Sequence, residues 1–118
     1  MNIPEESTLL RIYLGESDRS GHQPLYQAIV EKARDNHLAG ATVLRGSLGF
    51  GKSSHLHSAK ILRLSMDLPI IIEIIDTEEK IAGFLPALKE MMAGGLVTTQ
   101  PIRVIHDGGG PEKENPTV

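Results

Sequence analysis

The sequence has no cysteine, no tryptophan and few aromatic residues. Without cysteine the chain can form neither a disulfide nor a thiolate metal site, and it has no cysteine nucleophile; this composition suits a reducing compartment. Aromatic residues make up 3% of the 118 residues, whereas hydrophobic residues make up 40%. We therefore expect one folded domain whose core is built from Ile, Leu, Val and Ala.

Long apolar runs are also missing. The longest, residues 70–75, is interrupted by Glu73 and is far shorter than the ~20 residues of a membrane-spanning helix. Residues 1–6 are acidic where a signal peptide would be basic and then apolar. The sequence therefore predicts a cytoplasmic protein that is not embedded in a membrane.

Acidic side chains are absent between Asp35 and Asp67. The whole chain has a net charge of −3, yet this interval carries only basic charges, on Arg45, Lys52, Lys60 and Arg63. A local basic segment in an acidic protein favours a small anion or one acidic partner surface, and it argues against general nucleic-acid binding. The alternative is a loop whose basic side chains are simply solvated.

Glycines are concentrated in the same interval. Residues 46–53, GSLGFGKS, match the G-x-x-x-x-G-K-[ST] pattern of a phosphate-binding P-loop. A P-loop, however, needs a helix directly after the glycines and several further βα units of ~30 residues each. Here the sequence continues with His-Leu-His and then Pro69, and too little chain remains for those units. We interpret the match as a coincidence of pattern.

Hydrophobic periodicity predicts four strands and two helices. Strands are expected at residues 8–14, 41–45, 70–75 and 96–106, and helices between Pro24 and Gly40 and between Asp76 and Gly94-Gly95. The order βαββαβ predicts an α+β, ferredoxin-like domain over residues 8–106, with an antiparallel four-stranded sheet and two helices on one face. We expect residues 1–7 to be a polar lead-in and residues 107–118 a flexible tail.

Three residues set expectations within these elements. Asp76 is predicted to cap the second helix, with Glu79 at the reciprocal position of a capping box. Pro86 lies inside that helix and removes one backbone hydrogen bond, at a cost of ~3 kcal/mol unless the helix kinks. Pro101 confines part of the last strand to an edge or a bulge.

The two periods also predict which side chains pack together. The expected core places one face of each helix on the sheet: Leu25, Ile29, Ile81, Phe84, Leu85 and Leu88 against Ile12, Val43 and Ile72. The opposite sheet face carries Leu9, Arg11, Tyr13 and Leu44. Because an apolar sheet face is usually covered, we predict a homotrimer with these faces turned inward.

Several segments resemble a known family. Ala41-Thr42-Val43 followed by Gly49-Phe50-Gly51-Lys52 resembles the T-V…G-F-G-[RK] segment at the base of the long T-loop in the nitrogen-regulatory PII proteins. Residues 68–75 are similar to that family's L-P-x-x-x-I-E-I strand, shifted by one residue, and residues 100–105 are similar to its final strand. A closer similarity is to a bacterial PII-like family of unknown function. It spans residues 9–105 and rests on RIYLGES (11–17), PLY (24–26), GATVLRG (40–46), GFG (49–51) and IIDTEEKI (74–81).

The resemblance implies a trimer that binds ATP or ADP in clefts between subunits. PII proteins hold the phosphates partly with a glycine- and lysine-rich loop between the second helix and the last strand. In this chain that connection is only Ala93-Gly94-Gly95, and two more residues lie between Val43 and Gly49 than in PII proteins. The resemblance also implies a client protein contacted by the flexible loop, with a membrane transporter as a candidate class.

We therefore predict a regulatory module that binds a small anion, with an adenine nucleotide as the candidate effector and no permanent cofactor. Glycine lets backbone N–H groups approach the anion, and basic side chains balance its charge. The predicted ligand-binding residues are Arg45, Gly46, Gly49, Phe50, Gly51, Lys52 and Lys60. Residues 48–58 are expected to be the most mobile internal segment and to become ordered when a ligand or partner binds.

Two other functions remain open at this point. His55 and His57 would share a face of an extended segment and could bind zinc or copper with a third ligand, such as His22, His37 or a residue of a neighbouring subunit. A small ferredoxin-like enzyme would need an acid–base group in a cleft, for which His37 and Glu73 are the candidates. A hairpin loop that needs positive φ angles would explain the glycines without any ligand.

Overall fold

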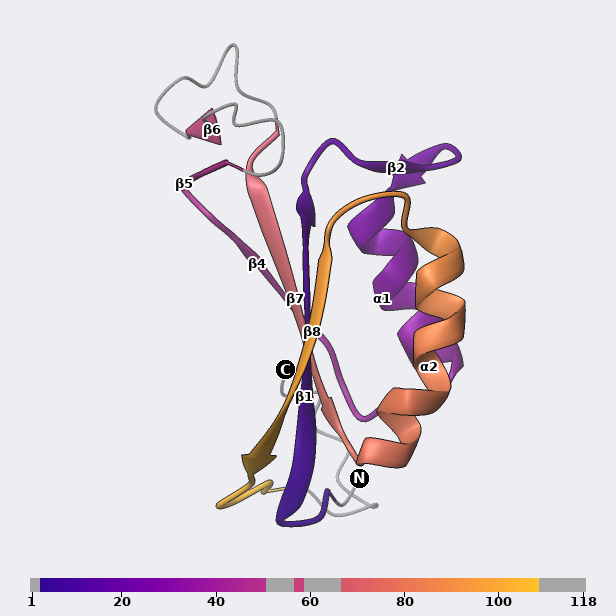
Figure 1. Cartoon of the computed structure of the whole chain (residues 1–118), viewed down its shortest axis with the longest axis vertical. Helices are drawn as coiled ribbons and strands as arrows, with labels where there is room; N and C mark the ends of the chain where they lie inside the picture. Colours follow the sequence, from indigo (N-terminus) through magenta and orange to yellow (C-terminus); the bar gives the residue numbers. More distant parts are fainter. Residues whose placement is uncertain (1–2, 51–56, 59–66, 109–118) are drawn as a thin grey trace.

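The computed structural model describes residues 3–50, 57–58 and 67–108. Within these ranges the sheet order is β4-β7-β1-β8, every neighbouring pair is antiparallel, and both helices cover one face (Figure 1). The elements are β1 (Glu6–Gly15), β2 (Arg19–Ser20), β3 (Gln23–Pro24), α1 (Leu25–Asp35), β4 (Thr42–Arg45), β5 (Leu48–Gly49), β6 (His57–Ser58), β7 (Pro69–Asp76), α2 (Glu78–Met91) and β8 (Leu96–Arg103). The α+β, ferredoxin-like arrangement is confirmed. Two short hairpins, β2–β3 and β5–β6, add to it.

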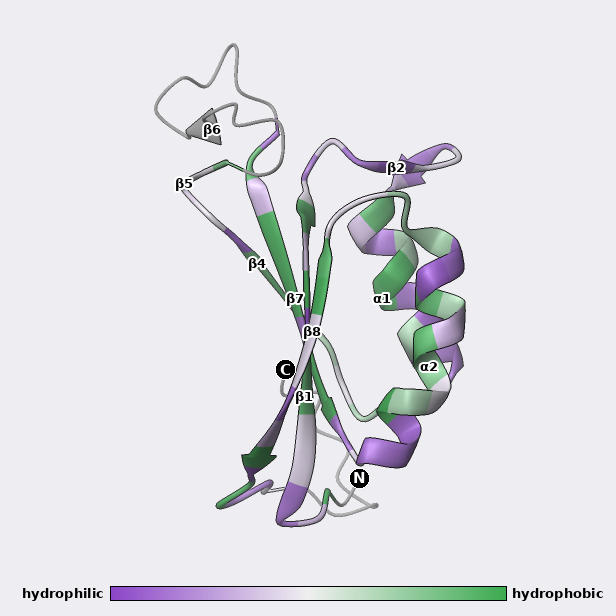
Figure 2. Ribbon diagram, in the orientation of Figure 1, coloured by the Kyte–Doolittle hydropathy of each residue, from purple (hydrophilic) through white to green (hydrophobic). Residues whose placement is uncertain are grey.

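The central strands β1 and β7 supply the sheet side of the core. In β7 every second side chain is buried, and the ribbon of β7 is hydrophobic over most of its length (Figure 2). Ile72 stands directly opposite Ile12 of β1 in the register. Because strand side chains alternate between faces, this register turns the buried residues of both strands toward the helices.

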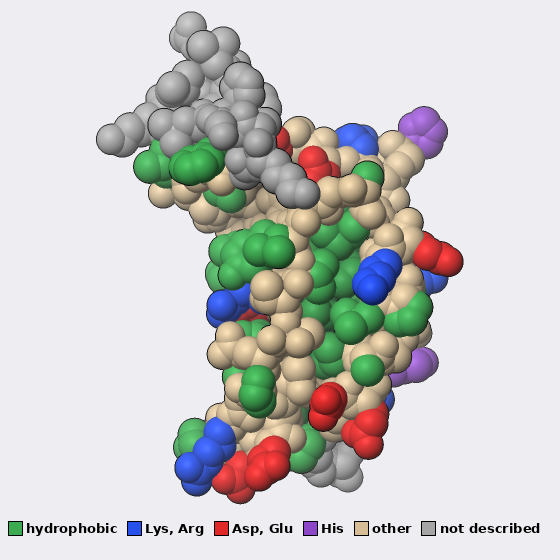
Figure 3. All heavy atoms as spheres, viewed as in Figure 1, with side chains coloured by type: hydrophobic (Ala, Val, Ile, Leu, Met, Phe, Trp, Pro, Cys, Tyr) green, Lys and Arg blue, Asp and Glu red, His purple; other side chains and the backbone are tan. Residues whose placement is uncertain are grey.

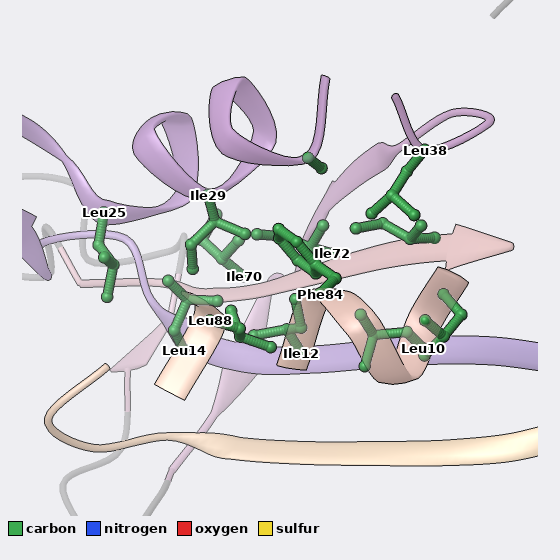
Figure 4. Packing of buried hydrophobic residues seen from close by; sticks show 13 residues of the cluster. Leu10, Ile12, Leu14, Leu25, Ile29, Leu38, Ile70, Ile72, Phe84 and Leu88 are labelled. Carbon is green, nitrogen blue, oxygen red and sulfur yellow. The ribbon is translucent and has the colours of Figure 1, made fainter. Parts of the chain in front are cut away.

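The helices complete this core with one face each. Buried side chains on α1 are Leu25, Ala28, Ile29 and Ala33, and those on α2 are Ile81, Phe84 and Leu88. Figure 4 shows Phe84 and Leu88 pointing toward Ile12 and Ile72 between the two layers. The predicted core is therefore confirmed at most positions, and Leu85 packs against its margin as a half-buried residue.

Val43 is an exception to the predicted core. It stands opposite Ile72 and so shares the helix-facing side of the sheet, yet it is 37% exposed. The reason is that β4 is an edge strand, whereas the helices lie over β1 and β7. Periodicity identified the correct face of β4 but not the extent of the helical layer.

The start of α2 also differs from the sequence prediction. Thr77, not Asp76, is the N-cap, and its side-chain oxygen accepts a hydrogen bond from the backbone N–H of Lys80 at 3.1 Å. Asp76 is the buried last residue of β7, where its carboxylate accepts from the N–H groups of Ala39 at 2.8 Å and Thr77 at 2.7 Å. Asp76 therefore fastens the chain before β4, and the predicted pairing with Glu79 is wrong because Lys80 occupies the third helical position.

The last two elements are shorter than predicted. α2 runs through Pro86 and ends at Met91, because Met92 has an extended backbone with ψ of 123°. In the connection that follows, Gly95 has φ of +93°, and an added Cβ would lie 2.6 Å from the carbonyl oxygen of Tyr13. β8 ends at Arg103 and lies at a sheet edge, which confirms the position predicted for Pro101.

The sheet face opposite the helices carries an apolar row followed by a polar row. We call it the open face. In register across the four strands, the apolar row consists of Leu44, Ile71, Tyr13 and Leu96, and the polar row of Thr42, Glu73, Arg11 and Thr98. Arg11 and Glu73 form an ion pair at 2.8 Å. Among the described residues, neither helix is long and apolar enough to cross a membrane.

Candidate functional site

The first predicted ligand residues lie where β4 ends and the connection to β7, residues 46–68, begins; we call this connection the glycine loop. The backbone N–H of Gly46 donates to the carbonyl oxygen of Pro69 at 2.7 Å, which joins this point to the start of β7. An added Cβ on Gly46 would lie 2.8 Å from Cγ of Pro69, and one on Gly49 would lie 3.1 Å from it. Both glycines have negative φ angles, so the requirement here is close packing on Pro69 rather than a left-handed backbone.

Arg45, the last residue of β4, pairs with a carboxylate that the sequence did not indicate. Its Nη2 lies 2.8 Å from Oε2 of Glu16, which follows the last residue of β1. The hydrogen bond and the charge of Glu16 raise the pKa of Arg45 above its usual value, and Tyr26 adds a smaller effect in the same direction. The side chains are 47% exposed for Arg45 and 29% exposed for Glu16, so the ion pair is only partly shielded from solvent.

Residues 15–18 hold the chain on the other side of the glycine loop as well. The N–H of Glu16 donates to the carbonyl oxygen of Leu68 at 2.8 Å, and the N–H of Ser17 donates to the Asp67 carboxylate at 2.9 Å. Chain segments before and after the loop thus meet at one corner, at the upper end of the sheet in Figure 1. We call Glu16, Ser17, Arg45, Gly46 and Pro69 the loop base.

The corner is itself held by local hydrogen bonds. The N–H of Gly15 donates to the Asp18 carboxylate at 3.0 Å, and the N–H of Asp18 donates to the carbonyl oxygen of Gly15 at 3.2 Å. The carbonyl oxygen of Asp18 then accepts from the N–H of Leu25, at the start of α1, at 2.7 Å. An added Cβ on Gly15 would collide with the Asp67 carboxylate. The position of Glu16 is therefore fixed from both sides.

The structure brings three of the seven predicted ligand residues together: Arg45, Gly46 and Gly49. Phe50 is exposed beside exposed Leu48, and Figure 3 shows apolar side chains at this end of the molecule. Gly51, Lys52 and Lys60 lie outside the described residues, as does most of the segment 48–58 for which mobility is predicted. Of that segment, Leu48–Gly49 pairs with His57–Ser58 as the β5–β6 hairpin.

Of the two histidines proposed for metal binding, His57 pairs with Gly49 in the β5–β6 hairpin, and His55 lies outside the described residues. Among the described residues, no group of three or more His, Cys, Asp and Glu side chains could hold a metal ion. His37 is exposed after α1, and its carbonyl oxygen accepts from Nζ of Lys80 at 2.9 Å. Glu73 is bound to Arg11 on the open face, where it borders a shallow hollow of about 300 Å³ at the start of β4. That hollow is at the opposite end of β4 from the loop base.

Comparison with protein families gives a match over residues 7–104, to the DUF190 family, described as Uncharacterized ACR, COG1993. The chain belongs to the DUF190 family. A UPF0166 protein of Aquifex aeolicus strain VF5 is 39% identical to this DUF190 chain over 98 residues, which cover 83% of the chain and 92% of that protein. A UPF0166 protein of Methanocaldococcus jannaschii is 37% identical over 93 residues, which cover 78% and 85% of the two proteins.

Solved structures confirm that the DUF190 chain has a PII-like fold. CPII from Thiomonas intermedia K12, a nitrogen regulatory PII-like protein bound to ADP, AMP and bicarbonate, superposes with a TM-score of 0.59 and 18% identity. The superposition covers 84% of this chain and 88% of CPII. A DUF3240 family protein from Shewanella baltica OS155 has a TM-score of 0.55 and 16% identity, over 91% of this chain and 98% of that protein. The resemblance seen in the sequence is thereby confirmed for family and fold.

Proposed function

We propose that this DUF190 protein is a PII-like regulatory module that binds a small anion at its loop base and carries out no chemistry of its own. The observation that supports this most directly is the half-exposed side chain of Arg45 beside the closely packed Gly46 and Gly49. It occurs in a fold shared with a protein whose structure contains ADP, AMP and bicarbonate, all of which are anions.

The residues of the loop base suit an anion for two reasons. Arg45 presents a planar set of N–H donors that can bind a phosphate or carboxylate through two parallel hydrogen bonds. Lys52 and Lys60, which follow in the sequence, would add positive charge. An adenine nucleotide is the first candidate for the ligand.

Bicarbonate is the second candidate, because one part of the PII phosphate site is missing. The connection between α2 and β8 contains Ala93-Gly94-Gly95 and no basic residue. Gly95 is packed against the Tyr13 carbonyl, so its Cα faces the sheet at close range. The loop base would therefore hold a phosphate with fewer contacts than PII proteins use, and a smaller anion would lose less by their absence.

The proposal includes assembly and a partner. The apolar row of the open face supports a homotrimer with these faces inward and the ligand in clefts between subunits. Exposed Leu48 and Phe50 support contact between the glycine loop and a client protein, for which a membrane transporter is the candidate class. We place the protein in the cytoplasm.

Isothermal titration of the wild-type protein with ATP, ADP, cyclic AMP and bicarbonate tests the proposal. We expect saturable binding of at least one of these anions, with each nucleotide recovered unchanged by chromatography after long incubation. Turnover of a nucleotide would favour an enzyme instead. If none of the four binds, the proposed ligand site is contradicted, and contact with a client protein is the remaining role proposed for the glycine loop.

A further inference from the structure

The ion pair between Glu16 and Arg45 differs from the other ion pairs of the described sheet. Arg11 and Glu73 stand opposite each other on neighbouring strands, so their pairing follows from the register. By contrast, Glu16 follows the last residue of β1 and Arg45 is the last residue of β4, and β7 lies between these two strands. Their side chains meet across the start of β7, at the place where we propose that the anion binds.

Glu16 is positioned by its own backbone. Its N–H is bonded to the carbonyl oxygen of Leu68, and the preceding Gly15 is held by the Asp18 carboxylate. These backbone contacts therefore position the Glu16 carboxylate beside Arg45. Oε2 of Glu16 lies 2.8 Å from Nη2 of Arg45.

The Glu16 carboxylate and a ligand anion would bind the same N–H donors of the Arg45 guanidinium. Carboxylate, bicarbonate and phosphate each offer two oxygens to a pair of parallel N–H groups. An anion that uses the Nη2 edge of Arg45 must therefore displace Glu16, and one that approaches without displacing it meets a negative charge. Because exposed ion pairs are weak, this displacement reduces affinity by only about two- to fivefold.

We infer that Glu16 is an intramolecular competitor of the ligand, a carboxylate that occupies Arg45 until a stronger anion replaces it. This inference rests on the proposed function and adds a determinant of affinity and selectivity at the same site. Chloride, which cannot form two parallel hydrogen bonds to a guanidinium, does not displace Glu16. Occupation by a stronger anion also frees Glu16 from Arg45, so the tie between β4 and the corner at residues 15–18 is released when the ligand binds.

Replacement of Glu16 by glutamine tests the inference, with Glu5→Gln as the matched control. Glu5 pairs with Arg103 at the same distance, 2.8 Å, so both variants lose one negative charge and one ion pair, of which the Glu5 pair is the more exposed. Glu5 precedes β1 and Glu16 follows it, so the control lies at the far end of the strand from the loop base. Titration with ADP and with bicarbonate should show about two- to fivefold tighter binding for Glu16→Gln and wild-type binding for Glu5→Gln.

A double-mutant cycle assigns the effect to Arg45. In an Arg45→Gln background, Glu16→Gln should give a smaller gain, because the group for which the two anions compete is gone and only the repulsion between Glu16 and the ligand remains. A gain as large as in the wild-type background would overturn the inference, as would equal binding by the two glutamate variants and the wild type. In the latter case the proposed function stands; if none of ATP, ADP, cyclic AMP and bicarbonate binds any variant, both fall.

Thermal unfolding of each variant shows whether the fold is intact. Glu16→Gln keeps the backbone bond to Leu68, so we expect a wild-type transition. If it does not fold, Glu16→Asp takes its place, since the shorter side chain keeps the charge but withdraws it from the guanidinium. That variant should bind ADP or bicarbonate more tightly than the wild type by a smaller factor than expected for Glu16→Gln. Unchanged or weaker binding would overturn the inference.

Discussion

At the scale of single residues, Arg45 and Lys52 are the two cations nearest in sequence to the glycines of the proposed site. Arg45 is paired with Glu16 at 2.8 Å, whereas Lys52 lies outside the described residues. An anion that binds Arg45 replaces one favourable contact by another. We propose that Lys52 adds a second charge-assisted contact to the anion and so contributes to the net affinity.

Replacement of Lys52 by alanine should therefore weaken anion binding by roughly 10- to 100-fold, as expected for the loss of one charge-assisted hydrogen bond. Titration with ADP and bicarbonate measures the change. Lys89→Ala is the control, because Lys89 is an exposed lysine in the last turn of α2 and its loss changes the net charge equally. If the two lysine variants bind alike, Lys52 is not part of the site.

At the scale of elements, the sequence predicted the fold because apolar spacing in each segment matches one period. α1 starts directly after Pro24, and β7 extends only one residue beyond each end of its predicted range. Errors arose where a residue's role depends on a distant segment. Asp76 was a reasonable cap for α2, but its carboxylate is used by Ala39, and Val43 is exposed because the helical layer stops short of β4.

The candidate site was predictable to the same extent. The basic and glycine residues that adjoin in sequence, Arg45 and Gly46 with Gly49, were recognised as a group because they lie on one segment. Glu16 and Pro69 join them only through the strand order, in which β7 separates β1 from β4. No local pattern around Glu16 indicates that its carboxylate reaches across a strand.

The contact between the β4–β5 turn and β7 predicts that a larger residue at Gly46 destabilises the fold. In Gly46→Ala the new Cβ would lie 2.8 Å from the Pro69 ring, so the turn or β7 must shift. We expect the free energy of unfolding to fall by about 1–3 kcal/mol, as for other overpacked sites, measured by urea denaturation. Gly40→Ala is the control, because a Cβ there meets nothing within 4 Å and its φ is not positive. Equal stability of the two variants would contradict close packing at Gly46.

At the scale of the whole molecule, the open face exposes a row of apolar side chains. Leu44 and Leu96, at the two ends of the apolar row, belong to the edge strands and are exposed, Leu96 by 57%. Between them, Ile71 and Tyr13 continue the row across the sheet. A row of this kind is covered in most soluble proteins, and the proposed trimer would cover it with two copies of the same face.

Leu96→Glu should therefore dissociate the trimer, because the charge would be buried between subunits without a partner. Light scattering at micromolar concentration should give three times the chain mass for the wild type and a lower mass for the variant. Val97→Glu is the control: Val97 is the next residue of β8, is also exposed, and stands opposite Ile12 on the helix-facing side. A wild-type protein that is monomeric at this concentration would refute the trimer.

The corner at residues 15–18 also has a consequence for how this fold can diversify. Because Glu16 and Ser17 bond to chain on both flanks of the glycine loop, the closure of that loop is secured by residues outside it. Lengthening a closed loop is then inexpensive, about 0.6 kcal/mol for each doubling of its length. We therefore expect that the sequence between Arg45 and Asp67 can be lengthened, in relatives or by an engineer who grafts a peptide there, without redesign of the sheet or the helices.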